Sequence, residues 1–171
     1  MDTGSILPKD IGALARRVVE ENKASGRKVV LAESCTGGLV ASALTEVAGS
    51  SAVLDRGFVT YSNEAKMESL GVSSEIIETF GAVSIACVWA MAKGALERSG
   101  ADVAVAISGV AGPDGGTELK PVGTVVFARV TRAKDGQAEG EPEGELKHFD
   151  GKNRAEIRSQ ATICALELLL P

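Results

Sequence analysis

Hydrophobic positions along the chain follow two spacings, one typical of amphipathic helices and the other typical of buried strands. Residues 11–19 place apolar side chains three and four positions apart, which predicts a first helix ending near Gly26. Residues 28–32 form a short, β-branched run of the kind that is buried on both faces of a sheet. Further strands are predicted at about 53–61, 102–108, 122–132 and 145–149.

The remaining helices are predicted from the same spacing and from their end signals. A helix over 39–47 is closed by Gly49, one follows at 63–70, and a short one is capped by Ser73 or Ser74. Another helix spans 84–98 with Gly100 as its stop, and the last helix starts near Asn153. Trp89 is predicted to lie in the core.

Helices that alternate with apolar strands predict a single three-layer α/β/α domain over residues 1–171, since this length suits one domain. The late strand–loop–strand pair makes the sheet mixed, mostly parallel, with about five strands. Residues 133–144 are rich in Asp, Glu, Gly and Pro and are predicted to form a flexible hairpin loop. The apolar segment 168–170 either packs on the sheet or makes a subunit contact. The second interpretation favours a homo-oligomer, which is the expected state.

Charge and composition exclude several classes of protein. The net charge of −5 argues against nucleic acid as a partner. A membrane-spanning helix needs about 20 apolar residues, and no apolar run approaches that length. Cys35, Cys87 and Cys164 lack the spacing of a zinc site or a disulfide framework, and His148 stands alone. A cytoplasmic protein without a metal is therefore expected.

The first candidate site lies where the strand at 28–32 meets the next helix. Glu33, Ser34 and Thr36 stand beside the Gly37–Gly38 pair, where free backbone N–H groups suit a phosphate or an oxyanion. A turn of this kind also serves close packing alone. The carboxylate and hydroxyls exceed what a structural turn needs, which favours a functional role.

A serine nucleophile requires a base, and lysine is the alternative to the single histidine. Tyr61, Asn63 and Lys66 lie where the second strand passes into a helix, so Lys66 could reach back to Ser34. As a base near neutral pH it would need a strongly lowered pKa, which burial near cationic partners could supply. The other interpretation is a surface lysine that pairs with an acidic neighbour one helical turn away.

The second candidate site is the glycine-rich segment from Ser108 to Gly116, which directly follows a strand. Glycines at Gly109 and Gly112 allow the backbone to approach an anion closely. Arg154 and Arg158 lie one helical turn apart at the start of the last helix and could clamp a phosphate, although such arginines are often simply solvated.

These segments together resemble the CinA C-terminal domain family. The motifs are AESCTGG at 32–38, RGFVTYSNEAK at 56–66 and SGVAGPDGG at 108–116 followed by KPVGTV at 120–125, and the resemblance runs from about residue 8 onward. Members usually carry Gly-Asp-Arg before the last helix, whereas this chain reads Gly-Lys-Asn-Arg at 151–154, with Arg154 as the matching arginine. The larger N-terminal domain of many CinA proteins is missing, so no pyrophosphatase activity is expected.

The resemblance implies a nicotinamide mononucleotide deamidase, which recycles pyridine nucleotides and uses no cofactor. Ser34 would attack the carboxamide, Lys66 would take the proton and return one to ammonia, and Tyr61 would relay or orient. The remaining residues would bind the oxyanion or the substrate: Glu33, Thr36, Gly37, Gly38, Asn63, Ser108, Gly109, Ala111, Gly112, Arg154 and Arg158.

Two alternatives remain. A thiol amidase would use Cys35 in place of Ser34. A non-catalytic nucleotide-binding or regulatory module would need the glycine-rich segments alone, and the presence of both Ser34 and Lys66 counts against it.

Overall fold

A computed structural model describes residues 4–133 and 143–171 of the chain. Its strands are β1 (Val29–Glu33), β2 (Leu54–Val59), β3 (Val103–Gly109), β4 (Thr124–Thr131) and β5 (Glu143–His148). Its helices are α1 (Lys9–Ser25), α2 (Leu39–Thr45), α3 (Asn63–Leu70), α4 (Ser74–Phe80), α5 (Ile85–Glu97) and α6 (Arg154–Leu168), with a short 3₁₀ helix at Ser50–Ala52.

The strands form one mixed sheet in the order β2-β1-β3-β4-β5. β1 pairs in parallel with β2 and β3, whereas β4 runs antiparallel to both of its neighbours. The parallel half of the sheet therefore brings the carboxyl ends of β1, β2 and β3 to one edge. This is the edge where open α/β sheets bind their ligands.

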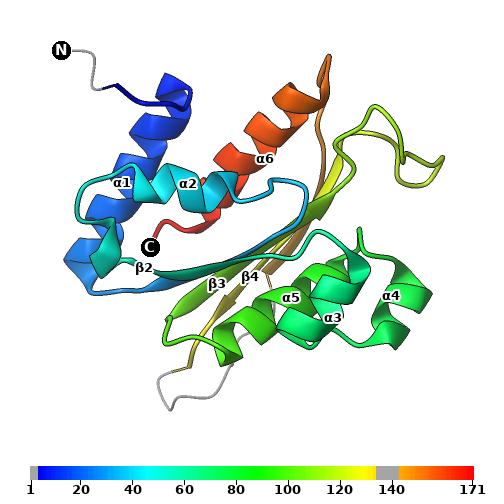
Figure 1. Ribbon diagram of the computed structural model, residues 1–171, viewed down its shortest axis with the longest axis horizontal. Coiled ribbons are helices and arrows are strands. Elements are labelled where there is room, and N and C mark those ends of the chain that lie inside the picture. Colours follow the sequence, from blue (N-terminus) through cyan, green and yellow to red (C-terminus); the bar gives the residue numbers. More distant parts are fainter. Residues whose placement is uncertain (1–3, 134–142) are drawn as a thin grey trace.

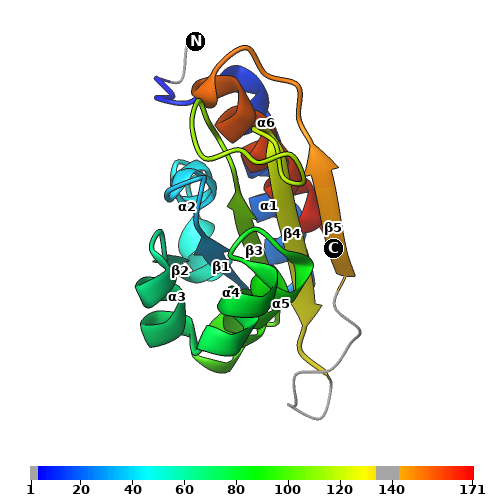
Figure 2. The same cartoon turned by 90° about the vertical axis from the view of Figure 1, so that its right-hand side faces the viewer.

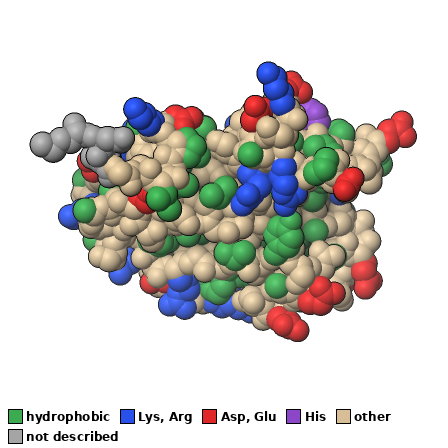
Figure 3. Space-filling model, turned by 45° about the horizontal axis from the view of Figure 1, so that its top comes forward, with side chains coloured by type: hydrophobic (Ala, Val, Ile, Leu, Met, Phe, Trp, Pro, Cys, Tyr) green, Lys and Arg blue, Asp and Glu red, His purple; other side chains and the backbone are tan. Residues whose placement is uncertain are grey.

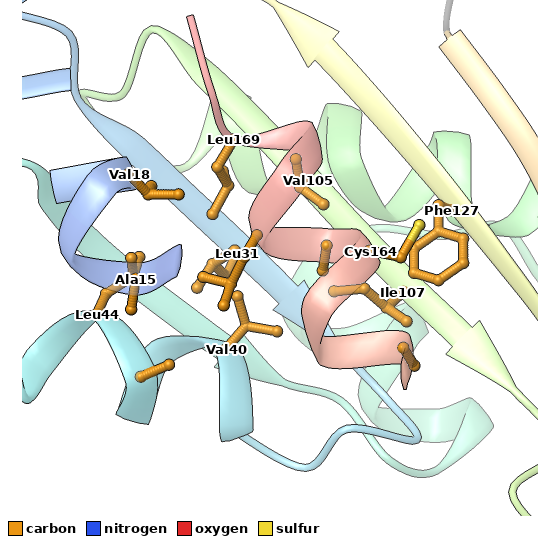
Figure 4. Close-up of a cluster of buried hydrophobic side chains, with 14 of the residues drawn as sticks. Ala15, Val18, Leu31, Val40, Leu44, Val105, Ile107, Phe127, Cys164 and Leu169 are labelled. Carbon is orange, nitrogen blue, oxygen red and sulfur yellow. The ribbon is translucent and has the colours of Figure 1, made fainter. Parts of the chain in front are cut away.

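Helices cover both faces of the sheet, which confirms the predicted three-layer fold. Figure 1 shows α1, α2 and α6 on one face and α3, α4 and α5 on the other, and Figure 2 shows the same layers from the side. Side chains alternate along the central strands, so Leu31 and Val105 join the core under α1 and α6 (Figure 4), whereas Val30 and Ala104 join the core under α5.

Several predicted boundaries shift in the structure. α2 ends at Thr45, and Gly49 instead precedes the 3₁₀ helix. Arg98, not Gly100, caps the end of α5. β5 begins at Glu143, two residues before the predicted start, and most of the predicted loop at 133–144 lies outside the described residues.

Two apolar residues for which the sequence left a structural question, Trp89 and Leu169, differ in burial. Trp89 was predicted to be core but is 37% exposed, because it lies on the outer side of α5 with Lys93 Nζ 5.9 Å from its ring centroid. Leu169 is fully buried in the core under α6, so the apolar segment 168–170 packs at least partly within the domain. Within the described residues, no helix is long and apolar enough to cross a membrane.

Candidate active site

Three hydroxyl side chains lie in a row at the carboxyl ends of the parallel strands. The sheet register pairs the last residue of β1 with the residues immediately before Thr60 and Ser108, so Ser34 stands between these two. Their strand positions continue those of Ala32 and Ala106, which belong to the core under α5. The row therefore faces α3 and α5, and all three residues are buried.

Lys66 reaches this row from the first turn of α3. The Ser62 side chain caps the helix by accepting a hydrogen bond from the Ala65 N–H at 3.0 Å, and Lys66 follows one position later. Its side chain turns inward and is 1% exposed. The lysine is thus a buried residue, not the surface lysine of the alternative interpretation.

Three oxygen atoms surround Lys66 Nζ. They are Ser34 Oγ at 3.0 Å, the Thr60 carbonyl at 2.8 Å and the Tyr61 carbonyl at 3.3 Å. Within the described part of the chain, no acidic side chain forms an ion pair with Lys66. Burial lowers the pKa of the Lys66 ammonium below its ordinary value of 10.5, because no carboxylate compensates the lost hydration.

This set of partners can accommodate the neutral amine form of Lys66, which the lowered pKa favours. Carbonyl oxygens accept hydrogen bonds and do not donate, so the Thr60 and Tyr61 carbonyls take the two N–H groups of an amine. The nitrogen lone pair then points toward the remaining partner, the Ser34 hydroxyl. A hydroxyl that donates to a neutral amine is the arrangement of a nucleophile and its general base.

The turn after Ser34 is built by two glycines in the left-handed region. Gly37 has φ 59° and Gly38 has φ 97°, and Gly38 directly precedes α2. The Gly37 N–H donates to the Ser34 carbonyl at 3.0 Å. Among the described residues, the N–H groups of Cys35, Thr36 and Gly38 make no such backbone bond, so Thr36 and Gly38 are among those available to an oxyanion.

Glu33 faces the opposite side of β1 from Ser34. Its carboxylate accepts hydrogen bonds from Thr36 Oγ1 at 2.7 Å, the Val40 N–H at 3.0 Å and the Ala41 N–H at 3.1 Å. Glu33 and Thr36 are both buried. The structure therefore places these two side chains at the start of α2, where they hold the turn, and does not bring them beside Lys66.

An open hollow of about 240 Å³ lies next to the buried pair. Cys35, Tyr61, Asp114, Arg154 and the glycine-rich segment 109–112 line it, together with Gly115. Arg154 spans its rim by donating to the Gly112 carbonyl at 2.7 Å and to Tyr61 Oη at 2.8 Å. Figure 3 shows one group of Lys and Arg side chains near the middle of a face, with other basic and acidic side chains along its margins.

The other predicted site residues occupy different places around this hollow. The Tyr61 side chain is 62% exposed and contacts Arg154, while its carbonyl contacts Lys66. Arg158 donates to the Cys35 carbonyl at 3.0 Å and to the Thr36 carbonyl at 3.2 Å, so it supports the turn. Asn63 is exposed, and its side chain has no hydrogen bond within the described residues. Ser108 and Ala111 are buried, whereas Gly109 is partly exposed.

Cys35 lies beside Ser34 but in an environment that keeps it a thiol. Burial raises the pKa of the Cys35 thiol to about 11, because desolvation outweighs the favourable charge of Arg158. A thiolate nucleophile at neutral pH is therefore not supported at this position. In the described ranges 4–133 and 143–171, no three His, Cys, Asp or Glu residues are grouped so as to hold a metal ion.

Thr60, whose carbonyl makes the shortest contact to Lys66, was absent from the predicted site residues. One signal was present: Thr60 immediately precedes Tyr61 at the end of the second strand, three positions before the first residue of the helix that carries Lys66. The alternation of side chains along that strand would have placed Thr60 on the face of Ser34.

The fold and this site define an α/β/α protein with a buried serine–lysine pair at the carboxyl edge of its sheet. The family model described as CinA C-terminal domain matches residues 11–171. Nicotinamide-nucleotide amidohydrolase PncC of Escherichia coli K12 is 52% identical over 91% of this chain and 90% of its own length. The PncC of Enterobacter agglomerans is 53% identical over 86% of each chain.

A solved structure agrees with these sequence relationships. The competence/damage inducible protein CihA from Agrobacterium tumefaciens has a TM-score of 0.88 and 50% identity, and the match covers 96% of both chains. The chain belongs to the CinA C-terminal domain family.

Proposed function

We propose that this protein hydrolyses the carboxamide of nicotinamide mononucleotide to give nicotinic acid mononucleotide and ammonia. The observation that carries the proposal is the 3.0 Å contact between Lys66 Nζ and Ser34 Oγ in a buried environment, where no acidic side chain of the described residues forms an ion pair with Lys66. The names of the PncC relatives, at 52–53% identity over most of each chain, support the same reaction here.

The first half of the reaction forms an acyl-enzyme. Ser34 Oγ attacks the carboxamide carbon while the Lys66 amine takes its proton. The N–H groups of Thr36 and Gly38 stabilise the negative oxygen, at about 3 kcal/mol for a well-placed donor. Lys66 then returns the proton to the leaving nitrogen, and ammonia departs as the C–N bond breaks. Water completes the cycle by hydrolysing the ester on Ser34.

The hollow beside the pair suits the nucleotide part of the substrate. Arg154 lies on its rim with a guanidinium that can turn to a phosphate, and the glycine-rich segment 109–112 presents backbone at close range. Tyr61 orients Arg154 through its hydroxyl. A local basic group of this kind lets an acidic protein bind an anionic substrate.

We also place this protein in the cytoplasm, where pyridine nucleotides are recycled and where its three buried, unpaired cysteines stay reduced. The sequence-based expectation of a homo-oligomer stays a prediction. Its original signal, the apolar segment 168–170, is largely accounted for by packing within the domain.

Ammonia release from nicotinamide mononucleotide tests the proposal, with metal chelator present. Wild type and Cys35→Ala are expected to turn over, whereas Ser34→Ala loses activity by about 10³-fold or more, because the attacking oxygen is gone. Circular dichroism checks that each variant is folded. Loss of activity in Cys35→Ala with full activity in Ser34→Ala would favour the thiol amidase. Tight binding of the mononucleotide without turnover by folded wild type would favour a binding module.

A further inference from the structure

The Thr60 hydroxyl is buried but forms no hydrogen bond within the described residues. The residue is 1% exposed, and Oγ1 has no hydrogen-bond partner among the described residues. A hydroxyl in this situation loses its hydration without compensation, so native proteins rarely keep one without a reason. The position of Thr60, immediately beside the serine–lysine pair, suggests what that reason is.

Two features place Thr60 beside the reacting atoms. The Thr60 carbonyl accepts a hydrogen bond from Lys66 Nζ at 2.8 Å, so the same residue is already in contact with the base. The Thr60 N–H donates to the Glu33 carbonyl at 2.9 Å, which continues the parallel ladder and sets Thr60 beside Ser34. Both side chains then lie on the face of the sheet that Lys66 covers.

The hollow lined by Cys35 and Tyr61 is the open space that a substrate group as large as a pyridine ring requires. The ligand for a buried hydroxyl beside the amine is a small molecule that donates hydrogen bonds. The proposed reaction supplies one, since an acyl-enzyme on Ser34 must be attacked by water under the control of Lys66.

Resting on the proposed function, we propose that Thr60 Oγ1 positions the water that hydrolyses the acyl-enzyme. One O–H of this water donates to the Lys66 amine and the other donates to Thr60 Oγ1, which aims an oxygen lone pair at the acyl carbon. The new C–O bond forms as Lys66 takes the first proton. The bond from carbon to Ser34 Oγ then breaks, and Lys66 passes its proton to that oxygen. Amine and serine return to their starting forms.

Thr60→Val separates this role from a structural one, because valine keeps the shape and leaves the backbone carbonyl in contact with Lys66. The expected result is a fall in kcat of about 10-fold to 100-fold, the effect of one lost hydrogen bond to a reacting molecule. Thr60→Ser is the matched control, which keeps the hydroxyl and loses the methyl group, and is expected to stay within about threefold of wild type. Stability to urea is expected to be unchanged or higher in Thr60→Val, since a buried unpaired hydroxyl is removed.

Rapid-quench kinetics identify the affected step. In Thr60→Val, ammonia is expected to appear in a fast burst of about one equivalent per site, followed by slow turnover, because acylation precedes the water-dependent step. Intact-mass analysis of quenched samples should then show the acylated protein.

Three results would overturn this inference alone: wild-type turnover in Thr60→Val, a slowed variant without a burst, or an equal loss in Thr60→Ser. A folded wild-type protein that releases no ammonia would instead overturn the proposed function, and this inference with it.

Discussion

Lys66 has three hydrogen-bond partners, and none of them is an acid. At the scale of the residue, this explains how a lysine can be buried at a strand edge. Within the described residues its charge is not neutralised by a carboxylate ion pair, and burial instead lowers the pKa of the ammonium. The consequence is that folding releases a proton from Lys66 at a pH where the unfolded chain still holds it.

Stability should therefore depend on pH through Lys66. Between the lowered pKa of the folded state and the ordinary 10.5 of the unfolded chain, the unfolded state binds more protons, so the free energy of unfolding rises with pH. In Lys66→Met this contribution is absent. We expect the stability of wild type relative to Lys66→Met to increase with pH between the lowered pKa and 10.5, as measured by urea unfolding of both proteins. A difference that stays flat up to pH 10.5 would contradict the lowered pKa.

Individual residues show which parts of the site could be predicted from the sequence and which could not. Ser34 and Lys66 could be paired from their motifs and their places at strand and helix ends. Glu33 was grouped with them because it is adjacent in sequence, yet side chains alternate along a strand, so Glu33 faces α2 while Ser34 faces α3. The exposure of Trp89 could not be predicted from helical spacing, because the spacing does not tell how far a neighbouring helix extends over it.

At the scale of elements, the position of Lys66 depends on how closely α3 approaches α5. Gly94 of α5 makes this approach possible, since a Cβ at Gly94 would lie 1.9 Å from the carbonyl oxygen of Leu70, the last residue of α3. The obstacle is backbone and cannot rotate away. The base is thus held in place by a helix contact on which no reacting atom lies.

Gly94→Ala is expected to destabilise the protein by about 3 kcal/mol or more and to lower kcat/KM, because α3 must move away with Lys66. Urea unfolding and ammonia release measure the two effects. Gly12→Ala is the matched control in α1, where a Cβ meets only Ser5 Oγ at 3.8 Å. That substitution should stabilise the helix by about 0.5–1 kcal/mol without changing activity. Equal stability of wild type and Gly94→Ala would refute the close approach.

Element types were predictable here, whereas their limits were less so. The helical and strand spacings identified every strand of the described sheet. The end of α2 was misplaced because Gly49 looks like a helix stop, although the chain leaves the helix at Thr45 and then makes a 3₁₀ turn. The early start of β5 was hidden because Glu143 and Gly144 are poor strand formers that pair with β4 nonetheless.

At the scale of the whole molecule, a buried polar contact joins the first and last helices. Asn22 is fully buried in α1 and donates through Nδ2 to the Val18 carbonyl at 2.8 Å and to the Leu169 carbonyl at 2.9 Å. Its Oδ1 accepts a hydrogen bond from Arg27 Nε at 2.7 Å. In the helix layer that covers this face of the sheet, α1 and the end of α6 are therefore joined by hydrogen bonds as well as by apolar packing.

Asn22→Leu keeps the branched shape of the side chain and removes these hydrogen bonds, so it should lower the free energy of unfolding by about 2–4 kcal/mol. Catalysis in the folded fraction should not change, because Asn22 lies in the core on the other side of the sheet from Lys66. Urea unfolding and ammonia release at low temperature check both statements. Ser25→Ala, at an exposed site near the end of the same helix, should stay within about 0.5 kcal/mol of wild type. A stable Asn22→Leu variant would show that apolar packing alone closes this layer.

The carbonyl contacts of Lys66 carry a further consequence, for how the site tolerates mutation. Both N–H acceptors belong to the main chain at Thr60 and Tyr61, and a main-chain carbonyl is present whichever amino acid is encoded there. The path of the chain therefore supplies these two acceptors, while the lowered pKa of Lys66 comes from its burial. Substitution of the Tyr61 side chain can therefore change the contact with Arg154 while the base keeps both acceptors, whereas at Thr60 only the carbonyl, and not the hydroxyl proposed to hold water, survives substitution.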